Sequence, residues 1–255
     1  FEVSGWLQRC QGWKLKYPVV LPEYKECKDA VNSFYFVQTL SEKLDKNAVI
    51  VTDMGTSFTC TMQTFKIKLG QRLSTSSGHA SMGFGLPGAI GACIGNNRKN
   101  TICISGDGGL QMNIQELQTI VHYNLPVKLF VLNNNGYLTI KATQQNHFGR
   151  FVGAEKSSGV TCPDIIKIAT AYGLPNIRIA NTEELNLKID SVLQATGPMV
   201  CEIIMEENQP LIPRVSSLKK PDGTIISKPI EDLYPFLSRE EFKENMIVAP
   251  TEILT

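Results

Sequence analysis

The sequence lacks an excess of either charge, and it lacks any long apolar run. Lys and Arg together number 25 and Asp and Glu 24, so the formal net charge is +1. Such a balance creates no field that would attract nucleic acid or an anionic membrane surface, and we expect neither partner. No apolar run approaches the roughly 20 residues that cross a bilayer. The opening FEVSGWLQRC also lacks the basic and apolar regions of a signal peptide.

Paired cysteines are missing as well. The seven cysteines are scattered singly, and no two of them have CxxC spacing. An odd number of isolated thiols favours buried or incidental thiols in a reducing compartment over a disulfide framework. Cys93 and Cys103 lie in apolar runs, which favours burial of both. We therefore expect a cytoplasmic protein.

What the sequence does contain is a regular alternation of strand and helix patterns. The pair Asn32-Ser33 is a helix N-cap signal, and Gly173 is a helix stop. Strands that alternate with helices predict an α/β fold with a doubly wound parallel sheet and helices on both faces. The strand patterns lie at 48–52, 101–107, 127–134, 176–180 and 198–206, and the helix patterns at 34–44, 84–95, 113–124, 138–147, 163–173, 182–195 and 238–246.

The pattern changes at both ends of the chain. Residues 1–30 are irregular and resemble a linker or the tail of a preceding domain. The alternating region, 31–207, is expected to form one domain. Residues 208–255 are polar and rich in proline, and we expect a C-terminal arm that lies over the domain or over a partner.

Two short motifs carry the chemistry. Gly106-Asp107-Gly108-Gly109 ends one predicted strand, and Asn134, within NNNG, ends the next strand 27 residues after Asp107. The carboxyl ends of parallel strands line one crevice, so both side chains should project into it. A carboxylate, an amide oxygen and a main-chain carbonyl suit Mg²⁺, which leaves its other positions to phosphates and water. Gly108 and Gly109 would let the backbone approach a phosphate, and a helix that starts near Asn113 would direct its amide end at the same anion.

Other interpretations of these motifs exist. GDGG alone can be a tight turn, and NNNG alone can be a loop. A dinucleotide-binding dehydrogenase is the nearest competitor, but it needs GxGxxG between a first strand and helix, which is absent. The P-loop motif GxxxxGK[ST] is absent too, which disfavours nucleotide hydrolysis. The spacing and the strand before each motif favour a diphosphate held through a divalent cation.

The pattern GDGG…NNNG resembles the thiamine diphosphate motif of the thiamine diphosphate-dependent enzymes. The run GDGGLQMNIQELQTIVHYNLPVKLFVLNNNGY is similar to the acetolactate synthase branch, as is SGHASMGFGLPGAIGA at 77–92. The likeness covers roughly residues 30–215. It implies the diphosphate-binding C-terminal domain of an acetolactate synthase-like enzyme, with thiamine diphosphate and Mg²⁺ as cofactors.

The resemblance also implies roles for particular residues. Asp107 and Asn134 would be the side-chain magnesium ligands, and Gly136 would add its carbonyl. The Ala80 carbonyl would receive the pyrimidine amino group, and Met82 would lie between the two cofactor rings. From the residues alone, Met82 could instead be a core side chain. The remaining residues expected to bind the cofactor are Gly55, Thr56, Ser57, Gly106, Gly108, Gly109 and Tyr137.

Catalytic residues are less defined. His79 could touch substrate, although a lone histidine is more often structural. In the family, the activating glutamate belongs to a separate pyrimidine-binding domain, and we find no such domain in this chain. The family lines its substrate pocket just past the NNNG motif, where Thr139 and Ile140 lie. Thr143 stands where acetolactate synthases carry a tryptophan, which puts their acceptor specificity in doubt.

The expected activity is decarboxylation or carboligation of a 2-oxo acid by a homo-oligomer, with this chain incomplete and inactive by itself. The pyrimidine-binding domain would come from the same or a second subunit. The alternative is a non-catalytic cofactor-binding or regulatory subunit that would keep both motifs and never meet the glutamate.

Overall fold

The structure is a computed structural model that describes residues 3–219 and 222–249. It contains two compact units, one running to Gln209 and one starting at Pro210. The side chain of Gln209 belongs to the first unit, where its Oε1 accepts from the Ser33 amide at 2.8 Å and its Nε2 donates to the Ser33 hydroxyl at 2.7 Å. Whether residues 1–30 and 208–255 act as separate segments stays a prediction.

The first unit is built on a six-stranded sheet in the order β2-β1-β3-β4-β6-β5. Every neighbouring pair of strands is parallel, so the predicted α/β fold with a parallel sheet is confirmed. The central strand β4 is buried along nearly its whole length, as its apolar pattern predicted. The strands are β1 (Val49–Thr52), β2 (Arg72–Ser74), β3 (Thr101–Gly106), β4 (Val127–Asn133), β5 (Asn176–Ile179) and β6 (Met199–Ile204).

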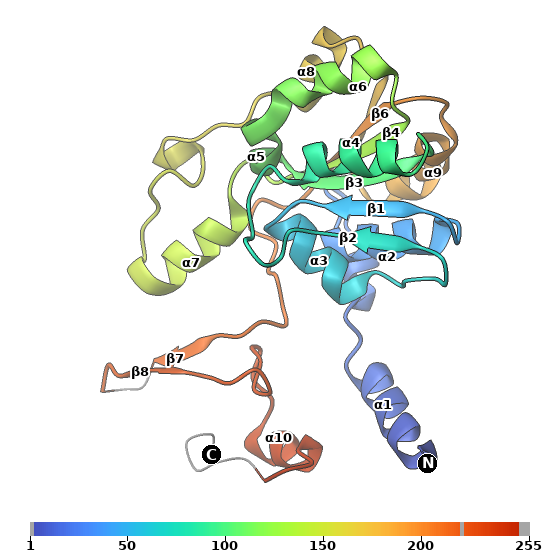
Figure 1. Cartoon of the computed structure of the whole chain (residues 1–255). Coiled ribbons are helices and arrows are strands. Elements are labelled where there is room, and N and C mark those ends of the chain that lie inside the picture. The colour runs from blue at the N-terminus through green and yellow to red at the C-terminus, as the bar shows by residue number, and fades with distance from the viewer. Residues whose placement is uncertain (1–2, 220–221, 250–255) are drawn as a thin grey trace. The chain divides into compact units, whose positions relative to one another are not determined.

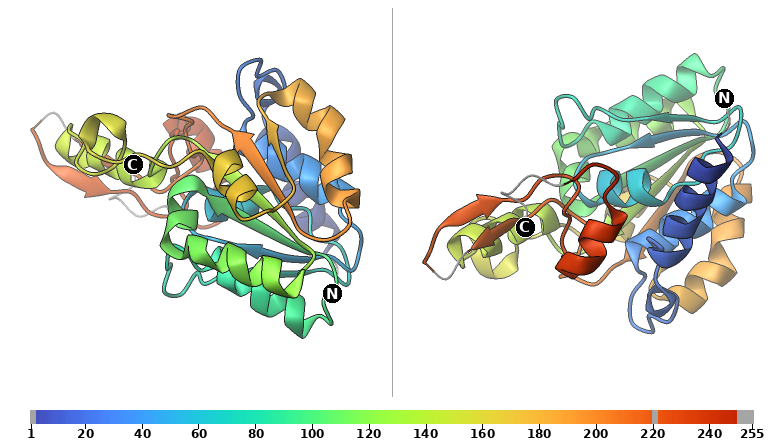
Figure 2. Two further views of the ribbon diagram at one scale, coloured as in Figure 1. Left: turned by 90° about the horizontal axis from the view of Figure 1, so that it is seen from above. Right: turned by 90° about the horizontal axis from the view of Figure 1, so that it is seen from below.

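Helices cover both faces of this sheet (Figure 1). In both views of Figure 2, α4 and α6 (green) lie on one side of the strands and α9 (orange) on the other. Helix α8 shares the face of α4 and α6, and α2 and α3 share the face of α9. The helices are α2 (Ser33–Lys43), α3 (Thr56–Thr64), α4 (Gly85–Gly95), α5 (Asp107–Leu110), α6 (Leu117–Tyr123), α7 (Leu138–Phe148), α8 (Ile165–Ala171) and α9 (Thr182–Gln194).

Local signals explain where several helices begin and end. The Asn32 side chain accepts from the amides of Phe34 and Tyr35, which caps α2 as predicted. Gly173 has φ +72° and follows α8, where it ends the helix as predicted. Helix α1 (Ser4–Lys16) precedes the sheet and contains no buried residue. Among the described residues of this unit, the 3₁₀ helices are η1 (Pro22–Lys25), η2 (Gln111–Glu116) and η3 (Lys156–Ser158).

A lysine lies inside the sheet. Lys128 in β4 is fully buried, and its ammonium group donates to the carbonyl of Ala195 at 2.6 Å and to the carbonyl of Gly197. These two carbonyls follow the C-terminus of α9, where backbone acceptors have no partner within the helix. Lys128 therefore fastens the end of α9 to the sheet.

The second unit is small. It contains an antiparallel hairpin of β7 (Ser217–Lys219) and β8 (Ile225–Ser227), which the sequence pattern did not predict, and helix α10 (Arg239–Asn245), which it did. Its buried groups include Phe242 and the carboxylate of Asp232. Asp232 accepts two hydrogen bonds from the Arg239 guanidinium, at 2.9 and 3.0 Å.

All seven cysteines are free thiols. Cys93 and Cys103 are buried as predicted, together with Cys60 and Cys201. Within the described residues, no helix is both long and apolar enough to cross a membrane.

Candidate functional site

The sheet order creates one crevice. From β1 the chain crosses outward to the edge strand β2, and it then returns to β3 on the other side of β1. Ligands of open parallel sheets bind where the order reverses in this way, beyond the carboxyl ends of the strands. Asp53 follows β1 and Asp107 follows β3, so the two carboxylates flank this position. Both side chains are about 1% exposed.

The GDGG motif forms the transition from β3 into a short helix. Strand β3 ends at Gly106, and α5 begins directly at Asp107. The helical path therefore starts at Asp107 and not near Asn113 as predicted. That the amide end of a helix here points at the diphosphate stays a prediction. Asn113 has φ −140° and interrupts the helical path, because its side-chain amide turns aside to donate to the Gly83 carbonyl at 2.8 Å.

The NNNG motif contacts Asp107. The Gly136 amide donates to Asp107 Oδ2 at 3.0 Å, while Asp107 Oδ1 accepts from the Gly108 amide at 2.8 Å. The side-chain amide of Asn134 donates to the Gly136 carbonyl at 2.9 Å, and Asn134 is buried. The structure thus brings together the three groups that were predicted to hold a metal. Their role as ligands stays a prediction.

The electrostatics of Asp107 fit a cation. Burial raises the pKa of Asp107 to about 6, and backbone amides that include those of Gly136 and Gly108 offset only part of this effect. None of the groups that shift this pKa carries a positive charge. A divalent cation would favour the ionised carboxylate. Within the described residues no group of three His, Cys, Asp or Glu side chains could hold a metal, so a site here depends on amide and carbonyl oxygens, as Mg²⁺ allows.

Contacts within the chain also explain why positions 108 and 109 are glycine, apart from the predicted approach of a phosphate. A Cβ on Gly108 would stand 2.3 Å from Cε1 of Tyr137, and a Cβ on Gly109 would stand 2.6 Å from Oδ2 of Asp53. Contacts within the chain therefore favour glycine at both positions. Gly136 is similar, because its φ of +145° and its closeness to the Ala154 carbonyl exclude a side chain.

The segment after β1 forms a tight turn into α3. Gly55 has φ +73°, a conformation that glycine adopts without strain, and α3 begins at Thr56. The Ser57 hydroxyl is buried and donates to the Met54 carbonyl at 3.0 Å. Thr139 of α7 lies close by, since a Cβ on Gly55 would stand 3.7 Å from its Oγ1.

The segment 79–82 is a surface loop. His79, Ala80 and Met82 are all exposed, and Ala80 has a left-handed φ of +55°. Met82 is 40% exposed, so the alternative that it is a core side chain is wrong. The loop is fixed at its end, where the Gly83 amide donates to Asp53 Oδ1 at 2.9 Å.

Asp53 was not predicted from the sequence. Its carboxylate also accepts from the Met54 amide at 2.8 Å and from the Ser105 hydroxyl at 2.9 Å. It therefore ties together the ends of β1 and β3 and the loop that ends at Gly83. The feature that could have identified Asp53 is its position directly after a buried strand. Asp107 has the same position after β3.

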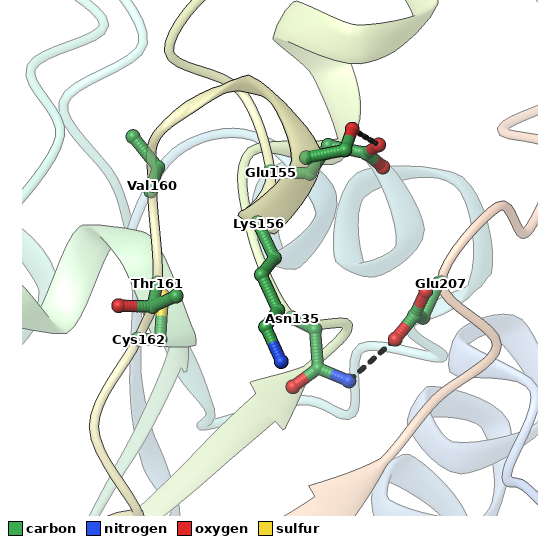
Figure 3. Close-up of a pocket in the computed structure, with 8 residues that line it drawn as sticks. Asn135, Glu155, Lys156, Val160, Thr161, Cys162 and Glu207 are labelled. Atoms are coloured by element: carbon green, nitrogen blue, oxygen red, sulfur yellow. Dashed lines mark hydrogen bonds between the residues drawn. The ribbon is translucent and has the colours of Figure 1, made fainter.

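A pocket of about 820 Å³ adjoins the NNNG motif. Figure 3 shows Lys156 extending from η3 toward Asn135, whose side-chain amide donates to Glu207 Oε1 at 2.7 Å. Cys162 also lines the pocket, and burial together with the nearby Asp107 carboxylate raises its pKa to about 12. Cys162 is therefore a neutral thiol beside Asp107.

A parallel sheet that brings the GDGG and NNNG motifs together at one crevice is typical of a cofactor-binding domain. Comparison with known proteins specifies the family of this domain. Residues 53–203 match the family described as "Thiamine pyrophosphate enzyme, C-terminal TPP binding domain". The chain belongs to this family, and its resemblance to the acetolactate synthase branch is confirmed. Membership also decides against the dinucleotide-binding dehydrogenase.

Similar curated proteins include acetolactate synthases. The chain is 32% identical to the acetolactate synthase large subunit of Cyanidium caldarium over 84% of this chain and 36% of that protein. It is 33% identical to the large subunit of Pyropia yezoensis over 89% of this chain and 38% of that protein. It is 32% identical to the chloroplastic acetolactate synthase 1 of Nicotiana tabacum over 85% of this chain and 33% of that protein. The chain thus spans little more than a third of their length.

Proposed function

We propose that this chain binds the diphosphate group of thiamine diphosphate through Mg²⁺, in an enzyme that acts on 2-oxo acids. The observation that carries the proposal is the 3.0 Å hydrogen bond from the Gly136 amide to the buried carboxylate of Asp107. No positively charged group is among those that shift the pKa of this carboxylate. Asp107, Asn134 and the Gly136 carbonyl would be the protein ligands of Mg²⁺. Oxygen donors of these three kinds suit this ion.

The other residues would surround the rest of the cofactor. Thr56 and Ser57 would lie beside the diphosphate with Gly55, Gly106, Gly108, Gly109 and Tyr137. The exposed loop at 79–82 leaves Met82 and the Ala80 carbonyl accessible to a ligand or a facing domain. When bound, thiamine diphosphate supplies an electron sink for breaking and forming carbon–carbon bonds next to a carbonyl. The chain's own contribution is to bind, orient and shield that group.

The reaction we propose is decarboxylation, carboligation or both. The activating glutamate would come from a pyrimidine-binding domain of the same or a second subunit, so the chain by itself would be inactive. Its coverage of about 36% of the Cyanidium caldarium protein supports the idea that a working enzyme needs more polypeptide. Thr143 is exposed at the position where a tryptophan shapes the acceptor pocket of acetolactate synthases. We therefore propose a different acceptor from theirs.

We further propose a homo-oligomer, in which a facing domain would cover the loop at 79–82. His79, which is exposed in that loop, is the candidate to touch substrate. The cytoplasmic location also stays a prediction, because the similar proteins include chloroplastic enzymes.

Magnesium-dependent binding of thiamine diphosphate tests the proposed site. Titration calorimetry on the natural full-length polypeptide should give binding that needs Mg²⁺ and that N134A weakens about tenfold or more, as loss of a metal contact does. The matched control is N135G, which removes the neighbouring side chain where φ is already +57° and should bind nearly as wild type. Equal affinity of N134A and wild type would contradict the assignment of Asn134.

Turnover separates the enzyme from the non-catalytic alternative. A panel of 2-oxo acids should show carbon dioxide release or ligation by the full-length polypeptide. Cofactor binding without turnover of any 2-oxo acid would favour a regulatory subunit.

A further inference from the structure

A buried carboxylate stands behind the NNNG motif. Glu202 in β6 is fully buried, and each of its oxygens has a different partner. Its Oε2 accepts from Nε of Arg178 at 2.6 Å, and its Oε1 accepts from the side-chain amide of Asn133 at 2.6 Å. A charged group without solvent is retained in a sheet only when such partners compensate it.

The register of the sheet explains why these three side chains meet. Glu202 pairs with Arg178 on β5 and with Val131 on β4. Asn133 lies two residues beyond Val131 on the same strand, and residues two apart point to the same face. Asn133 is therefore diagonal to Glu202 on one face, at the carboxyl end of β4.

Asn133 transmits this contact to the metal motif. Its Oδ1 accepts from the amide of Asn135 at 3.0 Å, a side-chain turn that spans two residues. Asn135 has φ +57°, a left-handed conformation that most L-residues adopt rarely and that this hydrogen bond would support. The next amide, that of Gly136, is the one that donates to Asp107.

We propose that Glu202 is a positioning residue that sets the orientation of the Asn133 amide and thereby holds Asn134 and Gly136 against Asp107. This inference rests on the proposed magnesium and diphosphate site and names the group that shapes it from behind. Glu202 does not touch the proposed metal.

The hydrogen bond between Asn133 and Glu202 requires a carboxylate at position 202 to fix the orientation of the Asn133 amide. An ionised carboxylate only accepts hydrogen bonds, so the Asn133 amide must turn its nitrogen to Glu202 and its oxygen to the Asn135 amide. A glutamine at position 202 can donate as well as accept. It would allow the Asn133 amide to turn over and to present its own N–H groups to the Asn135 N–H. The turn would then lose its acceptor although the shape of the side chain is unchanged.

The test compares E202Q with a swapped pair, E202Q/N133D. In the swapped pair, glutamine donates to the aspartate and still accepts from Arg178, while the aspartate supplies the oxygen for Asn135. The control is V200A, a truncation on the same strand and face that reduces packing without reaching Asn133. All variants are made in the natural full-length polypeptide.

The readouts are the affinity for thiamine diphosphate with Mn²⁺, measured by the manganese EPR signal, and hydrogen exchange of segment 133–137 without ligand. E202Q should weaken binding by about tenfold, the lower end of the effect of losing a group that orients a metal ligand, because Glu202 acts through Asn133, and it should speed exchange. V200A should lower the melting temperature and leave affinity near wild type. The swapped pair should recover most of the affinity and the protection.

Three results would overturn the inference: unchanged affinity in E202Q, an equal loss in V200A, or no recovery in the swapped pair. Failure of the wild type to bind the cofactor with Mn²⁺ would instead refute the proposed function, and the inference with it. The two failures are therefore distinguishable by the wild-type titration.

Discussion

Replacing Gly108 by alanine should destabilise the ligand-free protein, although glycine at this position in the motif suggests a role only toward a phosphate. The added methyl group would stand 2.3 Å from Cε1 and 2.6 Å from Cδ1 of Tyr137. Both distances are far below van der Waals contact, so the Tyr137 ring must move. Gly106, two residues earlier in the same motif, is the matched control. A Cβ there would meet nothing within 4 Å, and its φ of −85° and ψ of 159° suit alanine.

The magnitude follows from the contact. Overpacking of this kind typically costs about 1–3 kcal/mol. Tyr137 is only partly buried, so the ring has room to swing and the cost should stay within that range. For a domain of this size, a cost of about 1–3 kcal/mol lowers the melting temperature by about 2–12 °C. Gly106→Ala should be neutral or stabilising by about 0.4–1 kcal/mol, because it restricts the unfolded chain.

Thermal melts followed by circular dichroism, without cofactor or metal, measure both variants. The double variant Gly108→Ala/Tyr137→Ala adds a second check, because removing the ring should relieve the clash and make the two costs less than additive. Equal melting temperatures for the alanine variants at positions 106 and 108 would refute the reasoning. It would also fail if the double variant lost the full sum of the single effects.

Three further outcomes are expected. Asp53→Ala should cost at least about 2 kcal/mol in a denaturant titration, because it leaves the buried Gly83 amide and other donors without an acceptor. Burial alone would raise the pKa of Asp232, but the Arg239 guanidinium brings it below its ordinary value. The folded pKa is thus the lower one, so this stabilisation of the C-terminal unit is present above about pH 4 and is lost as pH falls further, which NMR shifts of residues 230–245 would follow. Met82→Ala should change stability by less than about 0.5 kcal/mol, since the side chain is 40% exposed, yet weaken cofactor binding.

Much of the sheet could be predicted because its signals are local and strong. The run from Val127 to Leu132 is apolar on both faces except at Lys128, and burial on both sides favours such a run. Asn32 and Gly173 act through their own backbone neighbourhoods, so their effect can be recognised without knowledge of the fold. The convergence of Asp107 with Gly136 followed from one further rule, that parallel strands end at one edge.

The elements that escaped prediction depend on distant partners. Strand β2 is three residues long, and only backbone pairing with β1 defines it. The residues of α3, TSFTCTMQT, have weak helix propensity, and the helix follows a turn that Gly55 makes possible. The ring of Tyr137 on Gly108 and the bond from Asn113 to Gly83 join residues far apart in the motif pattern, and no spacing rule predicts them.

The position of Lys128 gives the protein a natural reporter. Its amine is sealed between β4 and the residues after α9, at the amino end of its strand and away from the ends that carry Asp53 and Asp107. An amine-selective reagent should modify the exposed lysines of the native protein and leave Lys128 unlabelled until the residues after α9 or the sheet itself open. Mass spectrometry of the Lys128 peptide would then count openings at this end of the sheet, even in a mixture where other surface loops fluctuate freely.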